Sequence, residues 1–166
     1  MKLSNGVETG IHCTAVLAGL KGDATLPALA LAEYYGVSPT YLLKHLGRLT
    51  EAGILESVPG PSGGYRLARL VDDISLLDVV LAIEGPEPAF RCNEIRQCGA
   101  DPLPADAYPA PCAIKVAMLK AEKAYRAALS ETRLTDILDA HGASSDPRVL
   151  ARGKRFVETR QRPQEG

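Results

Sequence analysis

The 166-residue sequence predicts a mainly α-helical fold with one small β-hairpin. Hydrophobic residues make up 46% of the chain but aromatic residues only 5%, so the core must consist chiefly of Ala, Leu, Val and Ile. Ala and Leu are strong helix formers, which favours helices over sheets. Residues 54–69 depart from this pattern, because two short segments flank a turn rich in Gly and Pro, as they do in a hairpin.

Three helices are predicted before the hairpin. The first two span residues 4–20 and 26–35, where apolar residues recur at helical spacing. The third spans residues 39–52, because Ser38 is a good N-cap and Pro39 suits the first helical turn. A tight turn joins the second helix to the third, which is the arrangement of a helix-turn-helix.

The hairpin follows these helices directly. Its strands are predicted at residues 54–58 and 65–69, with the turn at 59–64 between them. A fourth helix is predicted at residues 76–84. Because three helices followed by a hairpin is the order of a winged helix, we predict a winged helix-turn-helix DNA-binding domain over residues 1–85.

Two further regions follow this domain. Residues 86–111 are rich in Pro, Ala and Asp and are longer than a normal connection, so we expect them to form a functional loop that binds a cofactor. Residues 112–141 begin with a long helix, to about residue 129, whose small and aliphatic residues suit packing against a partner helix. We therefore predict a long C-terminal dimerisation helix, with a short helix at 135–140.

The C-terminal tail, residues 142–166, is polar. It carries six basic residues against three acidic ones, and few apolar residues interrupt them. Segments of this composition bury too little apolar surface to offset the entropy of ordering. We predict that the tail is disordered apart from a short helix near residues 149–157.

Charge and hydropathy limit the location and the partners of the chain. The net charge of −1 gives no overall attraction to DNA or to acidic membranes, so DNA binding must depend on local Lys and Arg side chains. The chain lacks an apolar run of about 18 residues and a signal-peptide hydrophobic segment at its start. We expect a cytoplasmic protein without a membrane partner, in which cysteines are seldom structural disulfides.

The predicted DNA contacts come from the third helix and the hairpin tip. The N-terminal residues of a recognition helix meet base edges in the major groove, and Lys and Arg supply phosphate contacts. The predicted DNA-binding residues are Ser38, Thr40, Tyr41, Lys44, His45, Arg48, Ser62, Gly63, Tyr65 and Arg66. Two alternatives to DNA binding remain: the third helix is a core helix with a solvated polar face, or the winged fold binds proteins instead of DNA.

Three cysteines lie in or beside the long loop. Cys92 and Cys98 are separated by five residues, and Cys98 and Cys112 by thirteen. Thiolates hold iron–sulfur clusters, and a loop can bring distant thiolates together. A thiol switch, a structural zinc site that includes His12, and inert thiols remain alternatives. We expect Cys13 to be a buried small side chain.

Helix residues 4–20 offer two further metal ligands. Glu8 and His12 are four residues apart, so both project from the same face of a helix. A carboxylate and an imidazole are competent iron ligands. The alternative is that Glu8 and His12 are an ordinary pair of surface side chains.

An enzyme is not expected, since the sequence lacks a recognisable nucleophile–base arrangement and a Gly-rich phosphate loop.

Five segments in order resemble the winged-helix regulators of the Rrf2 family, the IscR, NsrR and RsrR type. The segments span residues 29–33, 37–42, 49–55, 60–65 and 74–80. The resemblance covers about residues 1–138. It implies a homodimer that is held by the long C-terminal helix and binds a two-fold-related DNA operator. It also implies the sensing of iron–sulfur status, nitric oxide or redox state, and a role as a repressor or an activator.

The N-terminal segment at residues 1–13 resembles the RsrR-like branch of this family. That resemblance implies a 2Fe–2S cluster held by Cys92 and Cys112 of one subunit and by Glu8 and His12 of the other. The family usually places its last two loop cysteines close together, and this chain departs from that pattern. A 4Fe–4S cluster with Cys98 as a ligand, and a cluster-free regulator, remain open.

Overall fold

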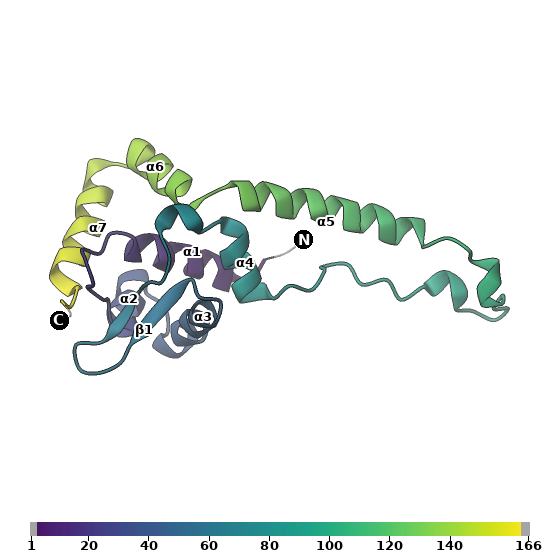
Figure 1. Ribbon diagram of the computed structural model, residues 1–166, viewed down its shortest axis with the longest axis horizontal. Helices are drawn as coiled ribbons and strands as arrows, with labels where there is room; N and C mark the ends of the chain where they lie inside the picture. Colours follow the sequence, from purple (N-terminus) through teal and green to yellow (C-terminus); the bar gives the residue numbers. More distant parts are fainter. Residues whose placement is uncertain (1–2, 164–166) are drawn as a thin grey trace.

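The structure, a computed structural model, describes residues 3–163 of the chain. Over this range the chain forms seven α-helices and one two-stranded sheet, which confirms the predicted fold class. The elements are α1 (Asn5–Leu17), α2 (Ala28–Tyr35), α3 (Pro39–Glu51), β1 (Leu55–Val58), β2 (Gly64–Leu67), α4 (Leu76–Glu84), α5 (Ala113–Glu131), α6 (Leu134–Ser144) and α7 (Pro147–Arg160). Figure 1 shows a body, which holds all helices except α5, and an arm, formed by α5 and the loop before it. No helix within residues 3–163 is both long and apolar enough to cross a bilayer.

The body is held together by one apolar core under α1, α3 and α4. Helix α3 contributes Leu42, Leu46 and Leu49, which are fully buried and lie at the i, i+4, i+7 spacing of a single helix face. Leu134, at the start of α6, joins the same core, so α6 is fixed to the body. The opposite face of α3 is therefore left to solvent.

Helix α1 lies close against its neighbours because two glycines face them. A Cβ atom on Gly10 would collide with Cδ1 of Ile83 in α4, and one on Gly6 would collide with the His45 ring in α3. Ser4 precedes α1, and its backbone N–H and hydroxyl both donate to the Glu84 carboxylate, at 2.9 and 2.6 Å. These contacts fix α1 on α3 and on the end of α4.

The hairpin forms an antiparallel pair in which Leu55 opposes Leu67 and Val58 opposes Gly64. Leu26, just before α2, adds a further backbone pairing with Tyr65. The three helices and the hairpin thus occur in the order of a winged helix.

The arm extends away from the body (Figure 1). Helix α5 has 19 residues and no buried residue within the chain. The loop before it contains only two single turns of 3-10 helix, Ile95–Gln97 and Ala105–Ala107. The predicted long helix and the predicted irregular loop therefore occur at the expected places.

The prediction of a disordered tail is wrong for most of its length. Helix α6 continues to Ser144, and α7 follows at Pro147–Arg160, longer than the predicted short helix. The Asp146 carboxylate caps α7 by accepting from the Arg148 backbone N–H at 2.8 Å. Val157 is buried against the body, which supplies the apolar contact that composition alone did not reveal. Residues 164–166 of the predicted tail lie outside the described residues.

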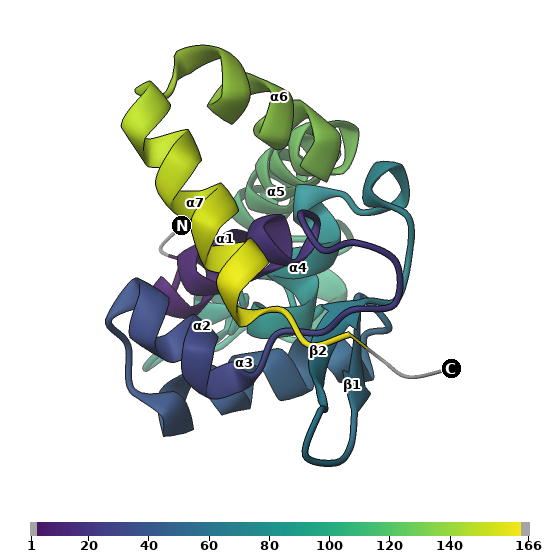
Figure 2. The same cartoon turned by 90° about the vertical axis from the view of Figure 1, so that its left-hand side faces the viewer.

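Figure 2 shows how α7 returns to the winged helix. The helix runs down one side of the body, and the chain after it reaches the hairpin side of the body, where Arg162 pairs with Thr25. A cavity of about 710 Å³ lies between α7 and the rest of the body, and the walls include His12, Tyr34 and Leu138.

Candidate functional site

The N-terminal half of α3 presents a polar face to solvent. Ser38 is the N-cap residue, and Thr40, Tyr41 and Lys44 follow with exposed side chains. The apolar stripe of the helix is turned to the core, so these side chains are free to meet a partner surface. The structure therefore brings together the predicted residues at the start of the recognition helix.

His45 does not belong to this face. Its side chain is 5% exposed, packs edge-on against the Tyr41 ring at 4.5 Å and contacts Gly6 of α1. Burial lowers the pKa of His45 from 6.5, and the charges of Arg48 and Lys44 lower it further. The predicted DNA contact at His45 is wrong in this structure, because α1 covers the ring where Gly6 lies against it.

Arg48 also has an internal partner. Its guanidinium donates to the backbone carbonyl of Ile83, near the end of α4, and the residue is half-buried. This bond ties the recognition helix to α4 and occupies part of the donor set that we assigned to phosphate. We therefore revise Arg48 from a predicted DNA contact to a side chain that orients α3.

The hairpin tip shows a similar division. Ser62 is exposed, whereas Tyr65 is half-buried and Gly63 is buried. Gly63 is required by the hairpin itself, because a Cβ atom there would collide with the Val58 carbonyl. The Arg66 guanidinium forms ion pairs with Glu56 at 3.0 Å and with Asp23 at 3.2 Å.

These pairs leave Arg66 with less free charge for DNA than the sequence implies. Hydrogen bonding to Glu56 raises the pKa of Arg66 above its ordinary value, so the side chain stays charged but paired. Sequence analysis missed Leu43, whose side chain is 46% exposed between Tyr41 and Lys44. Helix periodicity could have identified Leu43, because it falls outside the apolar stripe that faces the core. An exposed apolar side chain at this position can contact a thymine methyl group.

The structure brings Cys92 and Cys112 together at the outer end of the arm. The two thiols lie near enough that each shifts the pKa of the other. Cys112 is the N-cap residue of α5, where the backbone N–H of Lys115, followed by that of Ile114, lowers the pKa of the Cys112 thiol. The backbone N–H of Glu94 acts to lower the pKa of Cys92, but desolvation, the Glu94 carboxylate and Cys112 prevail and raise it. Of the two thiols, Cys112 therefore ionises first.

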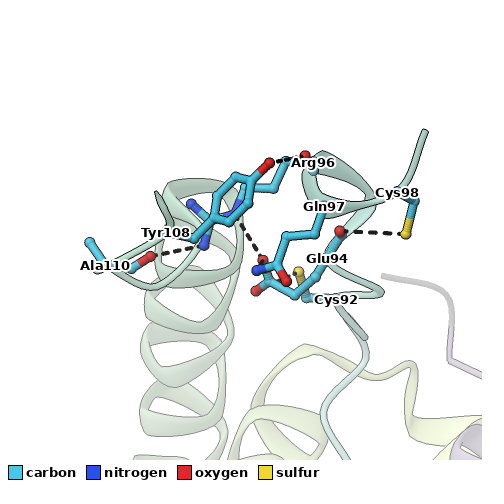
Figure 3. A network of polar contacts seen from close by, with 7 residues as sticks. All are labelled: Cys92, Glu94, Arg96, Gln97, Cys98, Tyr108 and Ala110. Carbon is cyan, nitrogen blue, oxygen red and sulfur yellow. Dashed lines mark hydrogen bonds and ion pairs between the residues drawn. The ribbon is translucent and has the colours of Figure 1, made fainter. Parts of the chain in front are cut away.

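Glu94 organises the loop around this pair (Figure 3). Its carboxylate accepts from Arg96 Nε at 2.8 Å and from the Gln97 amide at 3.3 Å, and the Cys92 thiol lies 3.6 Å from it. Glu94 takes up a left-handed backbone conformation, with φ at 49°. Glu94 has no distinctive signal in the sequence, because a lone Glu between two cysteines has many ordinary roles.

Cys98 is separated from the pair. Its thiol is exposed and donates to the Glu94 backbone carbonyl at 3.8 Å, and Figure 3 shows it on the other side of that residue from Cys92. Cys13 is fully buried, and desolvation raises its pKa to about 12, so the expectation of an inert buried thiol is confirmed.

Glu8 and His12 lie together on the outer face of α1, and both are exposed. Together with Ile11 they line one shallow surface groove of about 420 Å³. The Tyr35 hydroxyl donates to the His12 backbone carbonyl at 2.9 Å, and the two rings lie 5.6 Å apart.

The two halves of the predicted metal site do not meet within one chain. α1 lies in the body, whereas the start of α5, which carries Cys112, lies at the far end of the arm (Figure 1). Within residues 3–163, three or more His, Cys, Asp or Glu side chains nowhere converge as a metal site would require. A site that used Glu8, His12, Cys92 and Cys112 would need two chains.

Comparisons with known proteins agree with this architecture. The profile of the Rrf2 family, described as an iron-dependent transcriptional regulator, matches residues 3–140. The HTH-type transcriptional regulator YffB of Lactococcus lactis is 36% identical over 141 residues, which cover 84% of this chain and 88% of YffB. These matches carry the names of transcriptional regulators and not of enzymes.

Solved structures show the same fold. IscR of T. potens is 25% identical with a TM-score of 0.64, and the match covers 91% of this chain and 96% of IscR. The oxidized form of Staphylococcus aureus CymR is 26% identical with a TM-score of 0.60, covering 83% of this chain and 96% of CymR. With the winged helix, the exposed recognition helix and the family match over residues 3–140, the chain belongs to the Rrf2 family of transcriptional regulators.

Proposed function

We propose that the chain is a homodimeric regulator that binds a two-fold-related DNA operator and senses redox state or nitric oxide through an iron–sulfur cluster. The observation that carries the sensor is the contact between Cys92 and Cys112 at the outer end of the arm. The exposed start of α3 and the hairpin tip support DNA binding through Ser38, Thr40, Tyr41, Lys44 and Ser62.

The arm supports the dimer. Its helix buries none of its own residues, yet its outer half carries four exposed apolar side chains: Ile114, Val116, Met118 and Leu119. An isolated helix with exposed apolar side chains is marginal in water, and burial against a second helix supplies the missing apolar contact. A second copy of α5 offers a matching surface, because a two-fold interface uses the same patch on both subunits.

We propose that Cys92 and Cys112 of one subunit and Glu8 and His12 of the other hold a 2Fe–2S cluster, as in the RsrR-like branch. The chemistry of the donors fits, because two adjacent thiols and an exposed carboxylate–imidazole pair provide four ligands. Such a cluster would supply one-electron redox chemistry, and its non-thiolate ligands would raise its reduction potential.

The residues of this chain prepare the two half-sites. The start of α5 favours the Cys112 thiolate, which is the form that binds metal. Glu94 and Arg96 hold the loop in place beside it through their ion pair at 2.8 Å. In the body, Tyr35 fixes the backbone of α1 at His12 through its bond of 2.9 Å.

A short path leads from the α1 half-site to the DNA-binding face. The outer face of α1 carries Glu8, and its inner face contacts the recognition helix where Gly6 meets His45. A ligand change that moves α1 must therefore move α3 or open this contact, because a close-packed interface tolerates little displacement. In a dimer this motion alters the spacing of the two recognition helices and hence the fit to an operator.

A second candidate is a cluster-free thiol switch. The Cys92–Cys112 contact favours it, since a low-pKa thiol beside a second thiol can form a disulfide when an oxidant accepts the two electrons and two protons. The solved structure of an oxidized CymR makes the comparison pertinent. This candidate keeps the same two cysteines but leaves Glu8 and His12 without a role.

The test is the visible spectrum, with iron and sulfide content, of full-length protein purified without oxygen. We expect about two irons and two sulfides per bound cluster. We expect Cys92→Ser, Cys112→Ser and His12→Ala to lose them. Cys98→Ser is the matched control in the same loop, and we expect it to keep the iron.

The other outcomes separate the candidates. About four irons, lost in Cys98→Ser, would replace the 2Fe–2S proposal with a 4Fe–4S site. A colourless protein that contains zinc, or one that forms a Cys92–Cys112 disulfide without iron after reconstitution, would refute the cluster. Operator binding is measured in a separate mobility-shift experiment at a fixed salt concentration, because affinity for DNA depends on salt.

A further inference from the structure

The C-terminal segment adds an edge to the wing sheet. The Thr25 N–H donates to the Arg162 carbonyl at 3.0 Å, and the Arg162 N–H donates to the Thr25 carbonyl at 2.8 Å. The next residue, Leu26, pairs in the same way with Tyr65 of β2, at 3.0 and 2.8 Å. The order across the sheet is therefore β1, β2, residues 25–26 and the C-terminal segment. Figure 2 shows the chain after α7 running toward this sheet.

The side chain of Arg162 reaches the tip of the wing. Its Nη1 donates to the Pro61 carbonyl at 2.7 Å and to the Gly63 carbonyl at 3.2 Å. The Thr25 hydroxyl donates to the Ser62 carbonyl between them, at 3.2 Å. Three consecutive carbonyls of the turn are thus held from one side, two of them by a single guanidinium.

The other end of the segment is anchored on α2. The rings of Phe156 and Tyr34 stack at 4.2 Å, and the Arg152 guanidinium lies 4.7 Å from the centre of the same Tyr34 ring. Arg160 forms an ion pair with Glu33 at 3.3 Å. Helix α7 and the residues after it therefore form a strap, residues 147–163, that runs from α2 to the wing tip.

We propose that this strap is part of the DNA-binding unit and that Arg162 is a positioning residue for the wing tip. The inference rests on the proposed DNA binding. The strap lies beyond the family match, which ends at residue 140. Sequence composition had placed the segment outside the folded domain.

The physical reason is the cost of ordering a flexible tip. The turn contains three glycines, at positions 60, 63 and 64, which permit many backbone conformations in a free hairpin. A loop that is ordered only on binding lowers affinity, and a loop that is ordered beforehand avoids this cost. Arg162 and Thr25 order the tip before DNA arrives.

The experiment compares Arg162→Ala with Arg155→Ala in the full-length protein. Arg155 is a matched control, because it is an exposed arginine on α7 for which no ion pair is found in the described chain. We expect Arg162→Ala to weaken operator binding about three- to tenfold, the range for losing a typical intramolecular hydrogen bond, and Arg155→Ala to change it less than about twofold. A deletion of residues 161–166 should weaken binding at least as much as Arg162→Ala.

Two further measurements decide the role of Arg162. Hydrogen exchange of the peptide over residues 59–66 should accelerate in Arg162→Ala and in the deletion, but not in Arg155→Ala. The slope of log affinity against log salt should stay unchanged in Arg162→Ala, because the residue holds the wing and does not itself touch a phosphate. A slope smaller by about one would assign a direct phosphate contact and overturn the positioning role.

Unchanged wing exchange in both Arg162→Ala and the deletion would also overturn the strap. The exchange measurement needs no DNA. If the wild-type protein fails to bind any operator, the proposed function fails, whereas the strap is still judged by the exchange of residues 59–66.

Discussion

The body and the arm are built on opposite principles. In the body, the 13-residue helix α3 buries Leu42, Leu46 and Leu49 completely. In the arm, the 19-residue helix α5 buries no residue, and its Ile114 is 65% exposed. The body is stabilised by contacts within the chain, whereas the apolar face of the arm needs a surface that the chain itself does not provide.

The root of the arm shows where contacts within the chain end. Glu122 and Arg126 of α5 form an ion pair at 2.6 Å. Arg126 donates to the Pro86 carbonyl at 2.9 Å, and Glu122 accepts from the Ala89 N–H at 2.9 Å. These polar contacts tie the base of α5 to the start of the loop, and the apolar residues lie further out.

The largest expected effect on folding is in the body. Leu134 is fully buried at the start of α6. We expect Leu134→Ala to lower the free energy of unfolding by about 2 to 5 kcal/mol, because it removes apolar contact and leaves a cavity. Urea denaturation measures this change. Leu103→Ala in the loop, where the side chain is 57% exposed, is the control and should change stability little.

Two acidic substitutions on the arm should weaken dimer formation instead of the folding of the body. Ile114 and Met118 are one helical turn apart and both exposed, so Ile114→Asp with Met118→Asp places two charges on one face. We expect about a hundredfold weaker dimer, or about 2.7 kcal/mol, with helicity of the body retained. Sedimentation measures the dimer, with Lys123→Asp as a control for added negative charge. An unchanged dimer would show that this face is not the interface.

A smaller effect should sharpen the role of close packing under α1. Gly10→Ala introduces a methyl group against Ile83. Overpacking costs about 1 to 3 kcal/mol, and the better helix propensity of Ala offsets part of it, about 1 kcal/mol. Thermal unfolding of Gly10→Ala measures the net loss. Gly47→Ala on α3 is the control, because a Cβ atom there meets nothing within 4 Å.

The smallest effect is a pH dependence from His45. Burial, followed by the charges of Arg48 and Lys44, lowers the pKa of His45 in the folded state from 6.5. Between the two pKa values the unfolded chain binds a proton on His45 and the folded chain does not. The free energy of unfolding therefore falls as the pH drops below about 6.5, and this decrease ends at the pKa of the folded state. His45→Phe should remove this part of the pH dependence of urea unfolding. The same pH slope in both proteins would contradict it.

The site was predictable only in part, and the reason differs from residue to residue. Helix periodicity placed Thr40 and Lys44 on the exposed face of α3, where the structure has them. The same periodicity could not exclude His45, because the side chain is covered by α1, a helix distant in sequence. Likewise, Arg48 looked like a phosphate ligand until its bond to the Ile83 carbonyl was known.

The loop gives the same lesson. Spacing alone left open whether Cys98 is a ligand beside Cys92 and Cys112, since an irregular loop has no fixed geometry in sequence. The start of α5 fixes Cys112, and the fold of the loop around Glu94 turns Cys98 away from Cys92.

Local signals in the sequence determined the helices, the hairpin and their order, because caps, turns and apolar periodicity act over a few residues. The N-cap at Ser38 and the glycine-rich turn after β1 are of this kind. Only the tertiary structure decided that α7 folds back, that Cys92 meets Cys112 and that Arg162 reaches the wing tip. These contacts join residues far apart in the chain, and they form because burial and hydrogen bonding depend on position in space.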